Sequence, residues 1–128
     1  MYCFDTNIII DIFRGDEDLK SRLEGLKDLE IFITPITLCE LYKGAYLFHD
    51  ATEKVKAVDD FLSLFKVLDF DENCCKEFGK EYSRLKKLGK MTSEFDLMIA
   101  SIAKTNDLIL ITRNKKDFDN INLKTEVW

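Results

Sequence analysis

Short apolar runs and helically spaced apolar residues alternate along the chain. The apolar runs predict strands at residues 1–4, 30–34, 66–70, 108–111 and 123–127. Between them, apolar residues three and four positions apart predict helices over 8–13, 16–28, 36–48, 51–65, 72–88 and about 93–104. Strands that alternate with helices are typical of a parallel sheet with helices on its faces. The pattern therefore predicts an α/β fold.

Two of these helices have a well-defined expected inner face. The spacing predicts that helix 16–28 buries Leu19, Leu23, Leu26 and Leu29. The same reasoning predicts that helix 72–88 buries Cys75, Phe78, Tyr82, Leu85 and Leu88, and that Gly89 ends it.

The composition is that of an ordinary globular protein. The 128 residues are 46% hydrophobic and 34% charged, which suits a single domain over residues 1–128. No apolar run approaches the ~20 residues that span a bilayer, and no basic-then-apolar leader opens the sequence, so we expect a cytoplasmic protein that does not enter a membrane. Four cysteines without a Cys-x-x-Cys pair, beside a single histidine, argue for reduced thiols and against zinc.

Charge alone does not indicate a partner. The formal net charge is −5, which argues against a protein held to nucleic acid by bulk charge. One stretch departs from this balance, because Lys76, Lys80, Arg84 and Lys87 form a basic stripe along the predicted helix 72–88. Such a stripe is either a solvated face or a patch that follows a phosphate backbone.

Acidic residues stand where predicted strands end and helices begin. Asp5 follows the first strand, Asp96 falls in the first turn of a helix, Asp117 follows the apolar run 108–111, and Glu40 lies on the helix after the second strand. Asp5 can also be a simple helix cap. In a parallel sheet these positions gather at one edge, where each pair of carboxylates 4 Å apart would repel by ~4 kcal/mol at an effective dielectric of 20.

A divalent cation would relieve this repulsion. Mg²⁺ or Mn²⁺ takes oxygen ligands and leaves positions open for water and phosphate. Such an ion can activate water for attack on a phosphodiester without any histidine. The acids therefore predict metal-assisted phosphoryl chemistry.

Four segments together resemble the PIN-domain ribonucleases, in particular the VapC toxins of toxin–antitoxin pairs. They are FDTNIII, TLCEL, FDLMIA and LITRNKKDF, which occur in the order and spacing of that family across nearly the whole chain. The sequence departs from the family at Met91-Thr92, where many members have Ile-Pro.

The resemblance implies a three-layer α/β/α sandwich that cleaves RNA endonucleolytically, leaving 5′-phosphate and 3′-hydroxyl ends. It implies that Asp5, Glu40, Asp96 and Asp117 hold Mg²⁺ or Mn²⁺, with Asn7 and Thr112 in support. Asn114 stands where some members have an acid, which leaves open whether it contributes beside Asp117. A homodimer and a small cognate antitoxin that covers the site are also implied.

RNA would need cations beside these acids. We expect Arg113, Lys115 and Lys116 to bind RNA next to the site, and Lys80 and Arg84 to bind it further out.

Other functions fit the sequence less well. A receiver domain would have adjacent acids after the first strand, and an aspartyl phosphatase would have Asp-x-Asp there, whereas this chain has Asp5-Thr6-Asn7. A PIN module without catalysis would be expected to have lost acids. The alternative that stays open is a PIN nuclease that processes RNA without being a toxin.

Overall fold

A computed structural model describes residues 1–128, and its centre is a five-stranded sheet. The strands follow the order β3-β2-β1-β4-β5 and all pair in parallel. They are β1 (Tyr2–Phe4), β2 (Ile31–Ile33), β3 (Lys66–Val67), β4 (Ile109–Thr112) and β5 (Thr125–Val127). The helices are α1 (Thr6–Phe13), α2 (Glu17–Glu24), α3 (Pro35–Tyr46), α4 (Ala51–Leu62), α5 (Glu72–Leu88) and α6 (Glu94–Thr105), with a 3₁₀ turn η1 (Lys115–Asp117) after β4.

The central strands are buried on both faces. Phe4 on β1 and Ile111 on β4 belong to one apolar cluster, whereas their neighbours Cys3 and Leu110 belong to the other. This alternation follows from the two-residue period of a strand. Since β1 lies between β2 and β4, the N-terminal strand is the middle of the sheet.

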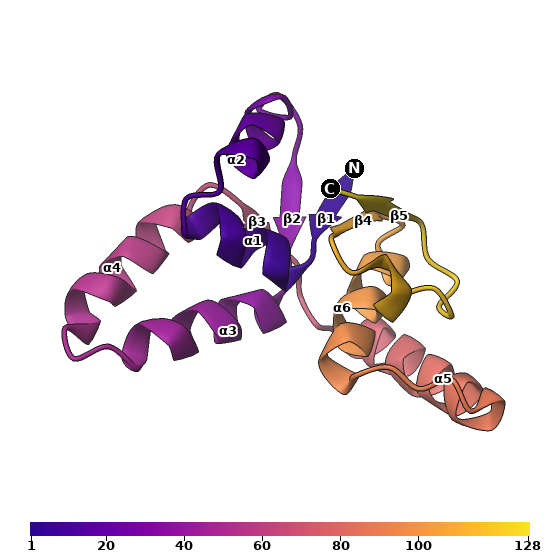
Figure 1. The fold of residues 1–128 in the computed structure, drawn as a ribbon. Helices are drawn as coiled ribbons and strands as arrows, with labels where there is room; N and C mark the ends of the chain where they lie inside the picture. The colour runs from indigo at the N-terminus through magenta and orange to yellow at the C-terminus, as the bar shows by residue number, and fades with distance from the viewer.

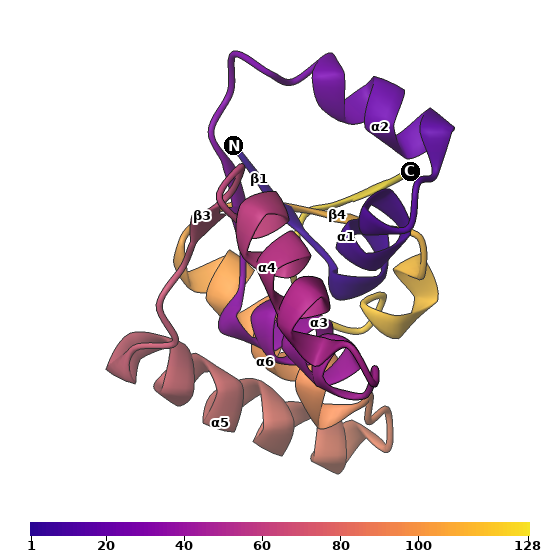
Figure 2. The same ribbon diagram turned by 90° about the vertical axis from the view of Figure 1, so that its left-hand side faces the viewer.

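Helices cover both faces of the sheet, which confirms the predicted three-layer α/β/α sandwich. Helices α1, α3 and α4 contribute to the cluster around Phe4, and α5 and α6 contribute to the cluster around Leu110. Figure 1 shows α3 and α4 on one side of the strands and α5 and α6 on the other. Both views place α2 at the opposite end of the molecule from α5 (Figures 1 and 2).

Several predicted elements were too long. Helix α2 ends at Glu24 rather than near Asp28, and the strand expected at 66–70 is only Lys66–Val67. Leu29 consequently lies outside a helix and is 50% exposed, because the chain turns before the apolar spacing ends. The other predicted elements are present within a few residues of their expected bounds, and Gly89 ends α5 in a left-handed conformation with φ of 67°.

The inner face of α5 also differs from its prediction. Cys75 and Leu88 are exposed, whereas Cys74, Glu81 and Leu85 are buried. The helix is therefore rotated so that a carboxylate faces inward between apolar neighbours. All four cysteines are free, as predicted, and burial followed by the nearby charge of Asp5 raises the pKa of Cys3 to about 12.

Trp128 packs against one face of the sheet. The backbone N–H of Trp128 donates to the carbonyl of Thr112 over 3.1 Å. The Trp128 ring packs on Phe4 with centroids 5.1 Å apart, and the guanidinium of Arg22 lies 5.7 Å from the ring centre. No helix of the structure has the length and apolar character needed to cross a bilayer.

Candidate active site

Asp5 is the most buried acid of the predicted site. It is 3% exposed and sits where β1 ends and α1 begins. Its Oδ1 accepts a hydrogen bond of 2.8 Å from the Thr6 N–H, and its Oδ2 accepts one of 2.7 Å from the Thr112 hydroxyl. Its backbone N–H donates to the Ile111 carbonyl over 2.9 Å. Asp5 is thus the cap of α1 and, through Thr112, is also held to β4.

Asp96 lines two neighbouring cavities, one of which is also lined by Asp5. One cavity of 200 Å³ is lined by Asp5, Asn7, Glu40 and Asp96. The other, of 270 Å³, is lined by Asp96 and Asp117 among others. Ser93 caps α6 by accepting a hydrogen bond from the Asp96 N–H over 3.1 Å, which fixes the start of the helix that carries Asp96. The four predicted acids thus line two neighbouring cavities that share Ser93 and Asp96, and we refer to these two cavities together as the opening.

Glu40 stands at the border of this opening. It is part of α3, whose first turn is tied to α1 by a hydrogen bond of 2.9 Å between the hydroxyls of Thr6 and Thr37. Its carboxylate forms an ion pair of 3.1 Å with Lys43. Gly44, one turn further on, lines a cavity together with Glu40, and a Cβ at Gly44 would meet no atom within 4 Å outside the backbone of its own helix and its chain neighbours.

Thr112 and Asn114 link Asp5 to the turn that carries Asp117. The Thr112 hydroxyl donates to Asp5 and accepts a hydrogen bond of 3.0 Å from the Asn114 N–H. The Asn114 carbonyl in turn accepts from the Asp117 N–H over 3.0 Å. This chain of contacts joins the end of β1 to η1. Asn7, by contrast, is exposed at the rim of the smaller cavity.

Burial and neighbouring charge raise the pKa of two of the acids, Asp5 and Asp96. Burial raises the pKa of Asp5, the hydrogen bonds from Thr112 and Thr6 oppose this, and the charges of Asp96 and Asp117 raise it further, so that it lies above its ordinary value. Burial and then the charge of Asp117 raise the pKa of Asp96, against the contact with Ser93. The site therefore holds more negative charge than its surroundings neutralise.

The donor set suits a hard divalent cation. All four acids offer oxygen, and no cysteine or histidine lines either cavity, which disfavours zinc. No three acidic, cysteine or histidine side chains are already arranged as a closed metal site. Mg²⁺ commonly keeps several waters and takes only one or two carboxylates, so a partly assembled set of acids is compatible with it.

The predicted RNA-binding cations divide into two groups. Lys115, Lys116 and Lys80 are exposed and form no ion pair, and Lys116 lines the cavity with Asp117. Arg113 instead pairs with Asp11 at 3.0 Å and with Asp16 at 2.9 Å. Arg84 pairs with Glu81. The two arginines thus have carboxylate partners within the protein. Glu81 and Arg84 are three residues apart on one helix, whereas sequence spacing did not indicate the pairing of Arg113 with Asp11 and Asp16.

Sequence reasoning missed Phe95. This residue precedes Asp96, is 61% exposed and lines the cavity that contains Asp5 and Glu40. An exposed aromatic ring in a cleft rich in carboxylates is unusual, since water solvates it poorly. The signal available in the sequence was its place between Glu94 and Asp96 in the first turn of α6.

Comparisons with known proteins identify the family of this chain. The model of the PIN domain family matches residues 2–124. Ribonuclease VapC2 of Haemophilus influenzae is 33% identical over 99% of this chain and 97% of its own length. The tRNA(fMet)-specific endonuclease VapC of Shigella flexneri is 29% identical over 99% of this chain and 97% of its own.

Solved structures extend the similarity to three dimensions. A chain in the crystal structure of VapBC2 from Rickettsia felis, bound to a DNA fragment from their promoter, superposes with a TM-score of 0.91 and 30% identity. The match covers 99% of this chain and 98% of that one. The family match, the fold and the full-length similarity agree, and the chain belongs to the PIN-domain family, among its VapC-type ribonucleases.

Proposed function

We propose that the chain is an endoribonuclease that depends on Mg²⁺ or Mn²⁺ and serves as the toxin of a type II toxin–antitoxin pair. The observation that carries the proposal is that Asp5, Asp96 and Asp117 line two neighbouring cavities that share Asp96. Burial, and after it the charges of Asp96 and Asp117, raise the pKa of Asp5. Carboxylates that repel one another at the carboxyl edge of a parallel sheet are suited to bind a cation. The ribonuclease names of the relatives support RNA as the substrate.

The residues have distinct roles in this proposal. Asp5, Asp96 and Asp117 would hold the ion, with Glu40 at the border of the opening. When bound, a divalent ion supplies an activated water and neutralises the charge that develops on the phosphodiester. Thr112 keeps the Oδ2 atom of Asp5 in place by donating to it, and Asn114 fixes the turn that carries Asp117.

RNA would enter across the opening. Phe95 offers a ring on which an unpaired base can stack, and Lys116 lies on the other side of Asp96 where a flanking phosphate would pass. Lys115 and Lys80 are free to contribute to the same path, whereas Arg113 and Arg84 are held by carboxylates.

An antitoxin would have a surface to bind next to the site. A cavity of 410 Å³ between α1, α3 and α4 is lined mostly by apolar side chains, with Glu40 at one border. Phe48, which lines it, is 51% exposed. The relatives in the VapBC complexes support a small protein partner, and an apolar segment of an antitoxin in this cavity would reach Glu40. The homodimer implied by the resemblance stays a prediction.

The burial of Asp96 and the nearby charge of Asp117 give a first prediction, which concerns the stability of protein kept free of metal with EDTA. The raised pKa of Asp96 means that protonation favours the folded state. Below the ordinary pKa of 3.8, the melting temperature of the Asp96→Asn variant should match that of the wild type. As the pH rises through the raised pKa of Asp96, the variant should melt at a higher temperature than the wild type. We expect a difference of roughly 2 °C at neutral pH, since relief of a screened repulsion is worth at most about 1 kcal/mol.

Thermal melts of both proteins from pH 3.5 to 7.5 measure this difference. Glu94→Gln is the matched control, because it removes an exposed acid from the same first turn and should not raise the melting temperature. Addition of Mn²⁺ should stabilise wild type but not the Asp96→Asn protein. A difference independent of pH would contradict the prediction.

The reaction itself is tested with purified protein and RNA. Cleavage should need Mg²⁺ or Mn²⁺, stop with EDTA, and fall by at least about 100-fold in Asp5→Asn and Asp96→Asn. Because one relative is named for tRNA(fMet), tRNA is the first substrate to test. Glu94→Gln should cleave as wild type does. Cleavage in EDTA, or full activity in both Asn variants, would refute the proposed site.

The toxin role gives a prediction in cells. Expression of wild type should arrest growth, and Asp96→Asn should abolish the arrest at equal protein levels. Colony counts and culture density after induction measure this. Harmless expression of a protein that cleaves RNA in vitro would instead favour the alternative, a PIN nuclease of RNA processing.

Phe95 provides a prediction about RNA binding. Phe95→Ala should weaken binding of single-stranded RNA by at least about 5-fold, since stacking of one base is worth ~1–3 kcal/mol. Fluorescence anisotropy in the Asp96→Asn background measures binding without cleavage. Tyr46→Ala is the control, because Tyr46 is 68% exposed and lines neither cavity of the site. Equal losses in both variants would remove Phe95 from the site.

A further inference from the structure

A buried carboxylate in the middle of α5 has no role in the chemistry described so far. Glu81 is 4% exposed, although an unpaired charge at such a position is costly. Its Oε2 lies 2.6 Å from Nη2 of Arg84, and its Oε1 lies 3.2 Å from Nζ of Lys104. Lys104 also pairs with Glu77 at 2.6 Å. Two acids and two bases therefore balance one another.

The balance of charge explains how Glu81 can be buried, but not why it is there. Burial raises the pKa of Glu81, yet the hydrogen bonds from Arg84 and Lys104 outweigh this and leave the pKa below its ordinary value, so the group is charged at neutral pH. Buried ion pairs contribute little net stability compared with apolar residues of the same size, and their better-supported use is to specify one geometry.

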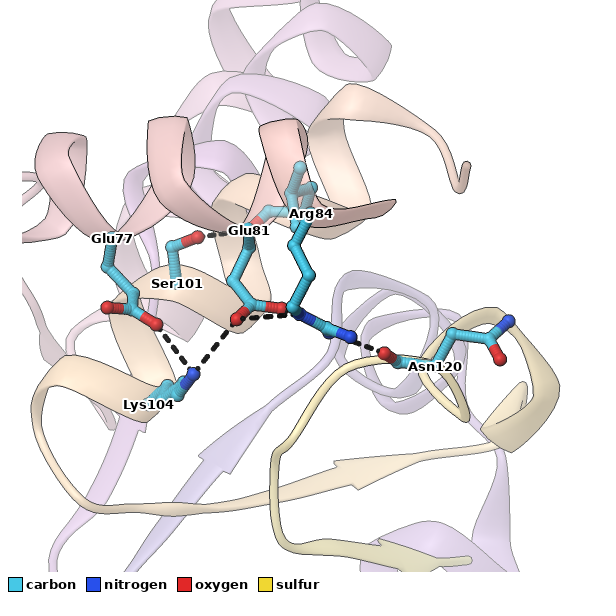
Figure 3. A network of polar contacts seen from close by, with 7 residues as sticks. Glu77, Glu81, Arg84, Ser101, Lys104 and Asn120 are labelled. Atoms are coloured by element: carbon cyan, nitrogen blue, oxygen red, sulfur yellow. Dashed lines mark hydrogen bonds and ion pairs between the residues drawn. The ribbon is translucent and has the colours of Figure 1, made fainter. Parts of the chain in front are cut away.

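The geometry that this network specifies involves the candidate active site. The same Nη2 atom of Arg84 that contacts Glu81 donates to the backbone carbonyl of Asn120 over 2.6 Å. Figure 3 shows Arg84 extending from Glu81 to Asn120, with Lys104 between Glu77 and Glu81. Asn120 follows Asp117 by three residues and lines the same cavity. Arg84 thus holds the segment that carries one predicted metal ligand.

Lys104 connects the network to a second ligand. Lys104 and Asp96 are on the same helix, α6. Glu81 therefore binds two side chains, of which one is on the helix of Asp96 and the other holds the segment of Asp117. Leu85, one turn after Glu81, lines the cavity between these two acids, so the network lies directly behind the opening.

We propose that Arg84, held in place by Glu81, is a positioning residue that fixes Asp117 relative to Asp96 for binding of the divalent ion. The proposal rests on the proposed function. Asp117 is in a turn rather than a regular helix or strand, and ligands on such segments are less well placed unless other contacts hold them. Because the acids are not yet closed into a metal site, each loss of order in the turn lowers the affinity for the ion.

Arg84→Met tests this without opening the core. The Arg84 side chain is 41% exposed, and Met keeps much of its apolar length while removing the contacts with Asn120 and Glu81. Glu81 keeps its ion pair with Lys104 in this variant, so its charge is not left unpaired. Lys80→Met is the matched control, since it removes one positive charge from the same helix one turn earlier and Lys80 forms no ion pair. Mn²⁺ affinity is measured by calorimetry without RNA, and hydrogen exchange is followed at residues 115–121.

Whether Arg84→Met binds Mn²⁺ more tightly or more weakly than the wild type distinguishes the loss of a positive charge from the loss of positioning. Loss of a cation alone should tighten Mn²⁺ binding slightly, whereas loss of positioning should weaken it. We expect Arg84→Met to bind Mn²⁺ ~10-fold more weakly, as outer-shell substitutions do, with faster exchange confined to 115–121. Lys80→Met should bind at least as tightly as wild type.

Other results would overturn the proposal. Mn²⁺ binding by Arg84→Met as tight as by Lys80→Met would leave Arg84 without a positioning role. Faster exchange throughout the protein would make Arg84 a residue of general stability instead. Failure of the wild-type protein to bind Mn²⁺ would refute the metal site itself, and so is distinguishable from failure of the positioning role.

Discussion

The buried carboxylate of Asp5 is the constraint on which the arrangement of the site depends. Its two hydrogen bonds come from the start of α1 and the end of β4, and hydrogen bonds to a charged group are worth ~1.5–3 kcal/mol each. They do not fully offset burial and the neighbouring acids, because the pKa of Asp5 remains raised. The carboxyl edge of the sheet thus holds an acid whose ionised form the protein alone does not fully stabilise.

That incompletely stabilised acid connects stability with function. A protein that retains repelling carboxylates is less stable than its sheet and core would allow, and binding of the proposed cation would restore the difference. Natural active sites commonly show this conflict between local stability and function. Here the conflict is confined to one edge of the sheet, while the two apolar clusters on its faces are free of it.

The sequence predicted what depends on local pattern. Apolar periods identified the layers, and the positions of Asp5, Asp96 and Asp117 after strands or at helix starts were enough to bring them together, because parallel strands end at one edge. Strand and helix ends were less accurate, since apolar residues such as Leu29 continue past the last hydrogen-bonded turn.

Contacts between distant segments could not be predicted in this way. Asp11 and Asp16, which pair with Arg113, lie far from it in the sequence, and so does Asn120, whose carbonyl binds Arg84. Only the Glu81–Arg84 pair has a local spacing, three residues apart on α5. The burial of Glu81 could not be predicted for a related reason. The basic residues around it predicted either a solvated face or a patch for phosphate, and only the packing of α5 against α6 brings Glu81 to Lys104.

The position of Trp128 has a consequence for spectroscopy. It is the single tryptophan of the chain and packs only within the apolar cluster on the α1, α3 and α4 side of the sheet. Its fluorescence therefore reports on that layer, while far-ultraviolet circular dichroism reports on all the helices, α5 and α6 included. Coincident transitions by the two methods would mean that the layers unfold as one cooperative unit, and separate transitions would mean that one layer outlasts the other.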